Sequence, residues 1–341
     1  MKSLRLSLAG FGVVGQSFVK LLNSKQDYLR EAYGIDVRLV GVGNARHGFI
    51  YREDGLDMSL LLELSASNRP LTDYEYVRHW DTLLKGLPET GANVLVEVTP
   101  TNLRDAEPGL SHIVAALRQG AHVVTANKGP GALAGAELLA LARQQGVQLR
   151  MEACVMAGTP VLSTLLDGMA GARIQSVRGI LNGTTNYILG AMADGHKYAE
   201  ALAEAQAQGY AETDPTADVE GYDTLAKTLI LAALVFNQPL KPEQVERQGI
   251  TAVSFEAVQQ AELEGKRIKL IATLQRSADG LEASVAPHVL PQNDPLARVV
   301  GVTNALTIQS DTLSEVTVIG PGAGGLATAQ GLLADVIACA R

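Results

Sequence analysis

Residues 4–15 read LRLSLAGFGVVG, and this stretch decides the fold of the first half of the chain. An apolar run from Leu4 to Ala9 leads directly into Gly10-Phe11-Gly12-Val13-Val14-Gly15, and apolar residues at helical spacing follow as far as Tyr33. Strand, glycine turn and helix in this order are typical of a dinucleotide-binding unit, because the glycines permit a tight turn and a close approach of pyrophosphate to the helix N-terminus. The alternative is a glycine turn that binds nothing, which the strand–turn–helix context disfavours.

Strand and helix signals keep alternating beyond this motif. We expect strands over residues 36–43, 93–99, 121–125 and 147–151, and helices over residues 13–33, 108–119 and 132–145. The segment 48–88 is rich in loop signals, apart from an apolar run at 58–64 that looks helical. The alternation predicts a Rossmann-type α/β fold, a doubly wound parallel sheet with right-handed crossovers.

The pattern changes from Glu152 onward. Helices are expected over 161–169, 197–208 and 216–236, and strands over 174–181, 266–275, 281–290 and 304–309. This mixture predicts an α+β domain with a mixed or mainly antiparallel sheet. The expected organisation is a dinucleotide-binding domain at 1–151, a substrate-binding and catalytic α+β domain at 152–318, and a C-terminal helix at 319–341 that returns to the dinucleotide-binding domain.

The composition narrows the class of protein. The chain has 341 residues, enough for two domains, and a formal net charge of −8 without a basic stripe, which argues against a nucleic-acid partner. Two cysteines without paired spacing favour a reducing compartment. The longest apolar stretch, Leu229–Phe236, is far shorter than the ~20 residues of a membrane span, and the N-terminus lacks a signal-peptide pattern. We therefore expect a cytoplasmic protein without a membrane partner.

The end of the second expected strand bears on the choice of dinucleotide. An NAD site usually has Asp or Glu there, which binds the ribose 2′-hydroxyl. This chain reads Gly43-Asn44-Ala45-Arg46-His47, without a carboxylate. Arg46 is suited to pair with the 2′-phosphate of NADP, and the other interpretation is a solvated surface arginine. NADP is therefore the expected cofactor, with NAD as the alternative.

Two further strand ends point to the same place. Thr99 ends the expected strand 93–99, and Lys128 ends the segment Thr125-Ala126-Asn127-Lys128. Ligands of open α/β sheets bind beyond the carboxyl ends of the strands. Thr99 is therefore a candidate for cofactor binding and Lys128 a candidate for contact with a ligand, although Lys128 also fits an ordinary surface lysine.

The candidate acid–base chemistry lies on the expected helix 216–236. Asp223 and Lys227 are spaced i, i+4, so they lie on one face and can pair, at the edge of an apolar stripe that continues to Leu234. Glu212 and Asp218 lie just upstream and place further carboxylates around one lysine. A structural ion pair is the alternative interpretation, and a charged pair in such a position is costly unless it is compensated.

Seven motifs together resemble homoserine dehydrogenase over essentially the whole length from Gly10. They are GFGVVG (10–15), TANK (125–128), EACVMAGTP (152–160), GILNGTTNYIL (179–189), GYAETDP (209–215), DVEGYDTLAK (218–227) and GPGAGG (320–325). The fourth to the sixth are highly specific in combination. The resemblance implies an NAD(P)-dependent oxidoreductase that interconverts L-homoserine and L-aspartate 4-semialdehyde, in threonine, methionine and isoleucine biosynthesis.

The resemblance also implies roles for single residues. Lys227 matches the proton donor or acceptor and is expected to be catalytic together with Lys128 and Asp223. The residues that match those around the amino acid are Lys128, Glu212, Asp218 and Asp223, and Lys128 is expected at the cofactor as well. Gly322 and Gly324 would return to the cofactor, which places the C-terminal helix on the first domain. The family's monovalent cation, taken as sodium, matches the Glu152 carboxylate and main-chain oxygens of Val155, Ala157 and Thr159. A homodimer and a short form without a C-terminal regulatory domain are expected as well.

Two other functions compete with this resemblance. An aspartate-semialdehyde dehydrogenase needs a cysteine nucleophile that a histidine activates. Cys154 is the plausible candidate, but it lies in an apolar run without a histidine in a recognisable partner motif, so a small buried residue is the better interpretation. A non-catalytic NADP-binding protein has no need for Glu212, Asp223 and Lys227 together. Turnover of homoserine distinguishes the three functions.

Overall fold

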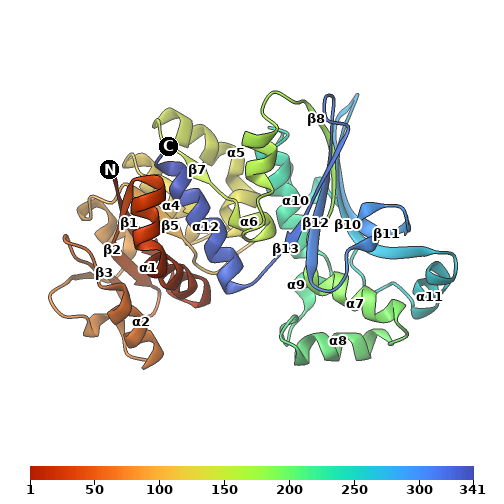
Figure 1. The fold of residues 1–341 in the computed structure, drawn as a ribbon, viewed down its shortest axis with the longest axis horizontal. Coiled ribbons are helices and arrows are strands. Elements are labelled where there is room, and N and C mark those ends of the chain that lie inside the picture. Colours follow the sequence, from red (N-terminus) through yellow and green to blue (C-terminus); the bar gives the residue numbers. More distant parts are fainter. The chain divides into compact units, whose positions relative to one another are not determined.

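The computed structural model describes residues 1–341, which form two compact units. Unit 1 contains Met1–Gly158 and Gly324–Arg341, and unit 2 contains Thr159–Ala323. The chain therefore leaves unit 1 once and returns to it for its last helix, which is blue in Figure 1. None of the helices combines the length and the apolar character that a membrane crossing requires.

Unit 1 is built on a seven-stranded sheet in the order β4-β3-β2-β1-β5-β6-β7. The strands are β1 (Lys2–Ala9), β2 (Ile35–Asn44), β3 (Gly48–Tyr51), β4 (Arg78–Trp80), β5 (Val94–Glu97), β6 (His122–Thr125) and β7 (Leu149–Arg150). β1, β2, β5, β6 and β7 run parallel, whereas β3 and β4 add an antiparallel edge. The order reverses between β1 and β5, so the expected doubly wound parallel sheet is confirmed.

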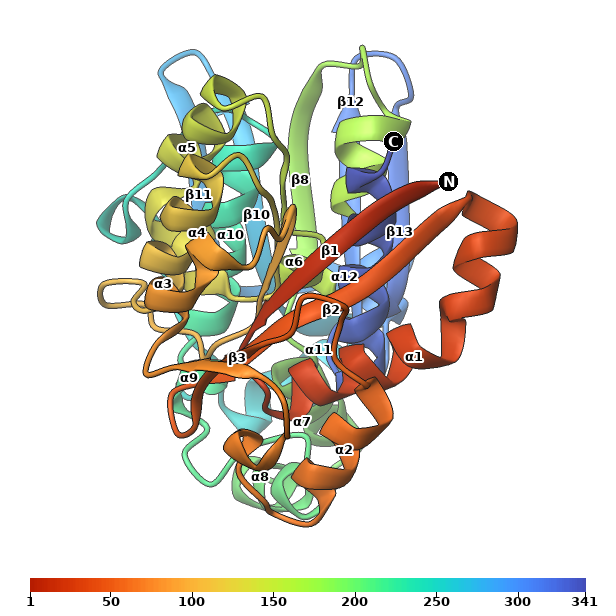
Figure 2. The same cartoon turned by 90° about the vertical axis from the view of Figure 1, so that its left-hand side faces the viewer.

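Helices cover both faces of this sheet. They are α1 (Val13–Tyr33), α2 (Met58–Ala66), α3 (Leu83–Gly86), α4 (Gly109–Arg118), α5 (Lys128–Gln144), α6 (Ala153–Met156) and α12 (Gly325–Cys339). Figure 2 shows α1 and α12 on one side of β1 and β2, with α4 and α5 on the other. Phe18 of α1, Leu332 of α12 and Leu8 of β1 are fully buried in one apolar cluster, which joins the N-terminal and C-terminal segments of the chain.

Unit 2 is built on a six-stranded sheet in the order β13-β12-β8-β10-β11-β9. The strands are β8 (Ile174–Ile180), β9 (Glu246–Arg247), β10 (Lys266–Ser277), β11 (Gly280–Pro291), β12 (Thr303–Ser310) and β13 (Glu315–Pro321). All pairs are antiparallel except β9 with β11, as a mixed sheet requires. The helices are α7 (Gly183–Ala193), α8 (Tyr198–Ala207), α9 (Thr216–Val219), α10 (Tyr222–Leu234) and α11 (Phe255–Leu263). The central strands of this sheet contribute Ile180, Ile271 and Ala305 to one buried apolar cluster.

Two of the expected helices differ from the structure. The helix expected over 216–236 is divided into α9 and α10, because Gly221 adopts a left-handed conformation (φ 79°) that no helix interior accommodates. In the region of the helix expected over 161–169, the structure has a π-helical turn, Thr164–Gly168. The sequence analysis also missed β3, β4, β9, β13 and α11, whose short or exposed segments have weak periodic patterns. The division at Gly221 matters for the site, since it turns Asp218 back toward the start of α10.

Candidate active site

The glycine turn after β1 has the geometry that a dinucleotide requires. Gly10 has a φ of +103°, and a Cβ there would lie 2.6 Å from the carbonyl oxygen of Val98. A Cβ at Gly15 would collide with the carbonyl oxygen of Gly10, whereas a Cβ at Gly12 would meet nothing within 4 Å. Gly10 and Gly15 therefore permit the turn and the close strand–helix packing, and Gly12 faces open space in which a ligand can approach the backbone.

Two helix N-termini lie next to each other at this turn. The first main-chain bond of α1 runs from the N–H of Gln16 to the carbonyl of Gly12 at 2.9 Å, so the N–H groups of Val13 and Val14 precede it. α12 begins beside them, because a Cβ at Gly325 would lie 2.6 Å from Ser17 Oγ and 3.5 Å from Val13 Cγ1. Helix N-termini offer unsatisfied N–H groups and positive partial charge. The pair is suited to bind an anionic pyrophosphate.

The glycine turn lies at the switch point of the sheet. The N–H of Val98 donates to the carbonyl of Ala9 at 2.8 Å, and a Cβ at Gly10 would lie 3.0 Å from the nitrogen of Thr99. The structure thus brings Thr99 next to the glycine turn, although they are far apart in sequence. Ligands of doubly wound sheets bind at this crevice.

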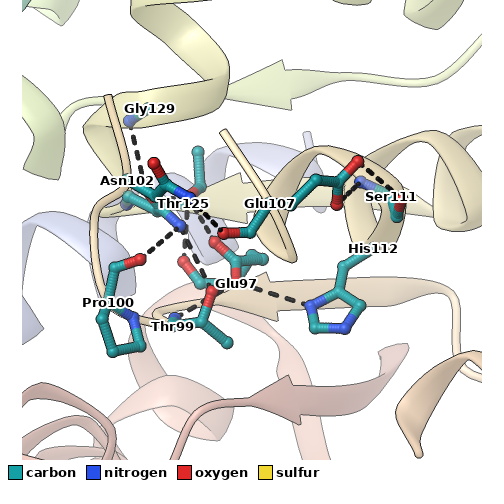
Figure 3. A network of polar contacts seen from close by, with 10 residues as sticks. Glu97, Thr99, Pro100, Asn102, Glu107, Ser111, His112, Thr125 and Gly129 are labelled. Carbon is teal, nitrogen blue, oxygen red and sulfur yellow. Dashed lines mark hydrogen bonds and ion pairs between the residues drawn. The ribbon is translucent and has the colours of Figure 1, made fainter. Parts of the chain in front are cut away.

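A buried carboxylate that the sequence analysis missed supports this edge of the sheet (Figure 3). Glu97, the last residue of β5, is fully buried, and its Oε1 accepts bonds from the Thr99 N–H at 3.1 Å and from the Thr99 hydroxyl. Its carbonyl accepts a bond from the Thr125 hydroxyl at 2.9 Å, and His112 Nδ1 lies 3.6 Å from Oε1. The available signal was a single carboxylate in the apolar run NVLVEVT. Buried carboxylates are retained when hydrogen bonds compensate them, as here.

Asn127 connects this network to Lys128. Its Oδ1 accepts a bond from the N–H of Gly129 at 3.1 Å and so caps α5, while its Nδ2 donates to Thr99 Oγ1 at 3.2 Å. Lys128 is the first residue of α5, and its N–H donates to Thr101 Oγ1 at 3.4 Å. Thr99 and Lys128 therefore belong to one hydrogen-bonded edge of unit 1.

Arg46 follows β2 in a tight turn. The Asn44 side chain accepts bonds from the N–H groups of Arg46 at 3.0 Å and His47 at 2.7 Å, which holds the turn between β2 and β3. The Arg46 side chain is exposed. At the position where NAD sites have a carboxylate, this chain has Asn44, whose side-chain oxygen already accepts hydrogen bonds from the backbone. The positively charged Arg46 lies two residues further on.

The polar cluster of unit 2 joins α7, α9 and α10. The expected pairing of Asp223 with Lys227 is confirmed, since Lys227 Nζ lies 2.7 Å from Asp223 Oδ2. Lys227 is only 6% exposed and also donates to the carbonyl oxygen of Leu181 at 2.6 Å. Asn182 Nδ2 donates to Asp218 Oδ1 at 2.7 Å and to Asp223 Oδ2 at 3.1 Å. Asn182 is a second residue that the sequence analysis did not single out, although it lies within the quoted GILNGTTNYIL motif.

The charges of this cluster act on Asp218. Burial raises the pKa of the Asp218 carboxyl above its usual value, and the neighbouring Asp223 carboxylate raises it further. Hydrogen bonding from Asn182 and the positive charge of Lys227 oppose that shift. The cluster combines two carboxylates and one ammonium, and such a set is suited to bind a second ammonium and to exchange a proton.

Glu212 lies apart from these hydrogen bonds. It is exposed, in the turn between α8 and α9, and its main-chain carbonyl accepts a bond from Gln206 Nε2 at 3.0 Å. The neighbouring Tyr210 carbonyl accepts a bond from the Thr184 hydroxyl at 2.7 Å, so the turn is attached to the start of α7. The structure therefore places Glu212 on a turn whose backbone is hydrogen-bonded to the first turn of α7.

The residues expected to bind a cation lie within the segment 152–159, which contains one strained residue, Ala157. Glu152 and Val155 are buried in unit 1, and Ala157 has a φ of +50° and a ψ of −116°, which is rare for a residue with a Cβ. Thr159 begins unit 2, where its carbonyl accepts a bond from the N–H of Val161 at 2.8 Å. A carboxylate with main-chain carbonyls is a set of hard oxygen donors, which suits a hard cation better than a soft transition metal. The residues present fit such an ion.

The GPGAGG segment spans the passage between the two units. Gly322 belongs to unit 2, where the amide of Asn304 packs so closely that a Cβ would collide with it. Gly324 belongs to unit 1 and precedes α12 with a φ of +114°. Of the two glycines expected at the cofactor, Gly324 therefore lies at the helix N-terminus beside α1, and Gly322 lies in the second unit.

Comparison with protein families gives matches along almost the whole chain. The model described as "Homoserine dehydrogenase, NAD binding domain" matches residues 10–152, and the model described as "Homoserine dehydrogenase" matches residues 160–337. The boundary between these matches lies close to the boundary between the two compact units.

Individual relatives give the same result. The chain is 41% identical to the NAD(+)-dependent homoserine dehydrogenase of Pseudomonas canavaninivorans, over 99% of this chain and 96% of that protein. It is 38% identical to the homoserine dehydrogenase of Methanocaldococcus jannaschii, over 97% and 96%. Among solved structures, a hyperthermophilic archaeal homoserine dehydrogenase in complex with NADPH has a TM-score of 0.85 at 29% identity, and covers 99% of this chain and 98% of its own.

Proposed function

Because the chain belongs to the homoserine dehydrogenase family, it catalyses the NAD(P)-dependent interconversion of L-homoserine and L-aspartate 4-semialdehyde, and we propose that Lys227 transfers the proton in this reaction. The reaction is a step of amino-acid biosynthesis. A bound NAD(P) would supply the hydride acceptor or donor for C4 of the substrate. The chain must bind both molecules and must move the proton of the hydroxyl.

The environment of the Lys227 ammonium carries this proposal. An ammonium has three N–H donors, and here two of them are directed to Asp223 Oδ2 and to the Leu181 carbonyl. The third donor serves the substrate oxygen. During oxidation of homoserine the neutral amine accepts the hydroxyl proton, and Asp223 stabilises the ammonium that forms. During reduction of the aldehyde the ammonium returns the proton to the new alkoxide oxygen.

We propose that unit 2 binds the amino-acid part of the substrate and that unit 1 binds the cofactor. Asp218, with Glu212 on the adjoining turn, would hold the substrate ammonium, and Lys128 would contact the substrate and the nicotinamide end of the cofactor. The support for Lys128 is its place in the hydrogen-bonded edge that contains Thr99. Asp223 acts with Lys227 in proton transfer.

NADP is the proposed cofactor, with NAD as the alternative. The glycine turn Gly10–Gly15 and the start of α12 at Gly324 would hold the pyrophosphate, and Arg46 would pair with the 2′-phosphate. The support is the exposed Arg46 side chain next to Asn44, where an NAD site has a carboxylate. Among the relatives, one structure is described in complex with NADPH and one sequence as NAD(+)-dependent.

The proposal has three further parts: a bound cation, a homodimer and a cytoplasmic location. A monovalent cation, taken as sodium, would bind the buried Glu152 carboxylate and the main-chain carbonyls of Val155, Ala157 and Thr159. A homodimer is supported by the edge strand β13, whose Ile319 is 55% exposed. A cytoplasmic location is supported by the cysteine content, since the sequence has two cysteines without the paired spacing of a disulfide framework.

Initial-rate assays test the proposed function. The enzyme is expected to reduce NADP or NAD with L-homoserine and to oxidise NADPH or NADH with L-aspartate 4-semialdehyde, without phosphate. Reduction of the cofactor by aspartate 4-semialdehyde that requires phosphate would instead indicate the acyl-transferring class of dehydrogenase. No turnover with homoserine in either cofactor would contradict the proposal. The assay also ranks the two cofactors by kcat/KM.

A further inference from the structure

At the start of α7, both the oxygen and the nitrogen of the Asn182 side chain make hydrogen bonds. It is 5% exposed, and its Oδ1 accepts a bond from the N–H of Thr185 at 2.9 Å, which caps the helix. This bond sets the orientation of the amide, because only the oxygen can accept it. The two hydrogens of Nδ2 are then directed to Asp218 Oδ1 at 2.7 Å and to Asp223 Oδ2 at 3.1 Å. One amide therefore connects a helix N-terminus with two carboxylates.

The two carboxylates come from different helices and carry the same charge. Asp218 lies on α9 and Asp223 in the first turn of α10, on either side of the left-handed Gly221. Their mutual repulsion in a partly buried site favours separation or protonation of one of them. The groups that face Asp218 are Asn182, which caps α7, Thr184 of α7, and Asp223 and Lys227 of α10. Lys227 is itself bonded to Asp223 and Leu181, which leaves Asn182 as the donor that both carboxylates share.

We propose that Asn182 is a positioning residue, which orients the Asp218 carboxylate for the substrate ammonium and the Asp223 carboxylate for Lys227. This inference rests on the proposed role of Asp218 in substrate binding. Its physical basis is that a neutral donor between two carboxylates lowers the free energy of the doubly ionised state without adding a competing charge. A cation at position 182 would compete with the substrate ammonium, whereas an amide does not.

The role has a consequence for pH dependence. Without the amide, burial and the Asp223 charge act on Asp218 with less opposition, so its carboxyl pKa rises and the protonated, uncharged form persists to higher pH. A protonated Asp218 attracts an ammonium less strongly. Loss of the amide should therefore raise the KM for homoserine and shift the acid limb of kcat/KM to higher pH, while kcat at alkaline pH changes much less.

Asn182→Ser separates this role from helix capping. A serine hydroxyl caps a helix about as well as an asparagine, but it lacks an amide that could bridge two carboxylates. Ser254→Ala is the matched control, because Ser254 Oγ accepts a bond from the N–H of Ala257 at 3.1 Å and caps α11, another helix of unit 2. That variant loses a cap without loss of a carboxylate partner. If Asn182 contributed to folding alone, Ser254→Ala would change the KM for homoserine as much as Asn182→Ser, or more.

The measurements are pH–rate profiles with homoserine and a carboxyl titration by carbon-13 NMR. For Asn182→Ser we expect the KM for homoserine to rise about tenfold or more, since a hydrogen bond to a charged group is lost. We also expect the Asp218 carboxyl to titrate at higher pH than in the wild type, with both properties unchanged in Ser254→Ala. An unchanged carboxyl titration in Asn182→Ser would overturn the inference. The titration needs no turnover, so it remains decisive even if the proposed function fails in the assay.

Discussion

Lys269 Nζ donates to Asn186 Oδ1 at 2.8 Å, and both side chains are buried. The same ammonium donates to the Val299 carbonyl at 2.7 Å, so its acceptors are uncharged. Asn186 in turn donates to the Gly301 carbonyl at 2.9 Å. Lys269 thus joins strand β10 to helix α7 and to the segment 299–303. None of these hydrogen bonds involves a carboxylate.

This relationship predicts a pH-dependent stability. Burial lowers the pKa of Lys269 from 10.5 to about 8, and the positive charge of Arg267 contributes to this shift. Between these values the unfolded chain retains a proton that the folded protein has lost, so the free energy of unfolding rises with pH over this window. Relative to Lys269→Met, the wild type should gain up to roughly 3 kcal/mol from pH 7 to pH 11, measured by urea unfolding. Lys266→Met is the control, because Lys266 lies on the same strand and its side chain is 44% exposed. Equal pH slopes of the free energy of unfolding in both variants would refute the expectation.

Lys227→Met should remove proton transfer. The expected loss of kcat is about 10²- to 10⁴-fold, typical for removal of a general acid–base group. The affinity for NADPH, measured by fluorescence, should stay within about threefold of the wild type, because the candidate cofactor residues lie on other elements. Lys266→Met removes a similar ion pair, with Glu264 at 2.8 Å on the surface, and should retain full activity. A Lys227→Met enzyme that retains about a third of the wild-type kcat would show that another group transfers the proton.

Arg46→Ala should discriminate between the two cofactors. Loss of a charge-assisted bond to a 2′-phosphate costs about 1.5–3 kcal/mol, or roughly a tenfold to hundredfold lower affinity for NADPH, whereas NADH lacks that phosphate. The control is Arg38→Ala, since Arg38 is an exposed arginine of β2 that pairs with Asp36 at 3.1 Å. Dissociation constants of both cofactors measure the effect. Equal weakening for NADPH and NADH would remove Arg46 from the phosphate site.

Gly109→Ala should disturb the edge that contains Thr99 and Lys128. A Cβ there would lie 2.5 Å from Asn127 Nδ2 and 3.1 Å from Glu97 Oε2, so the network around Glu97 must shift. We expect weaker cofactor binding and at least roughly tenfold lower kcat/KM, since displacements of ~1 Å near a catalytic site are costly. Gly190→Ala is the matched control in α7, where a Cβ meets nothing within 4 Å and should stabilise the helix by about 0.5–1 kcal/mol. Wild-type kinetics in Gly109→Ala would mean that the network has no influence on the site.

The local patterns of the sequence were sufficient for much of unit 1. The helix predicted over 13–33 is α1, Val13–Tyr33, because an apolar period of 3.6 and a terminal glycine are both local signals. Gly34 ends this helix with a φ of 67° and donates to the Arg30 carbonyl at 3.1 Å. The same logic failed across Gly221, since a single glycine inside an apolar period is compatible with either a continuous or a divided helix.

The sequence by itself determined the dinucleotide turn, the alternation of strands and helices, and the pairing of Asp223 with Lys227, because each depends on residues that are neighbours within one or two turns of backbone. Only the tertiary structure decided that Glu97 supports Thr99 and Asn127, and that Asn182 joins Asp218 to Asp223. These contacts connect buried polar side chains, and such side chains need hydrogen-bond partners within the folded protein. Which partner satisfies them depends on how strands and helices pack, and the packing depends on contacts across each unit rather than on any single segment.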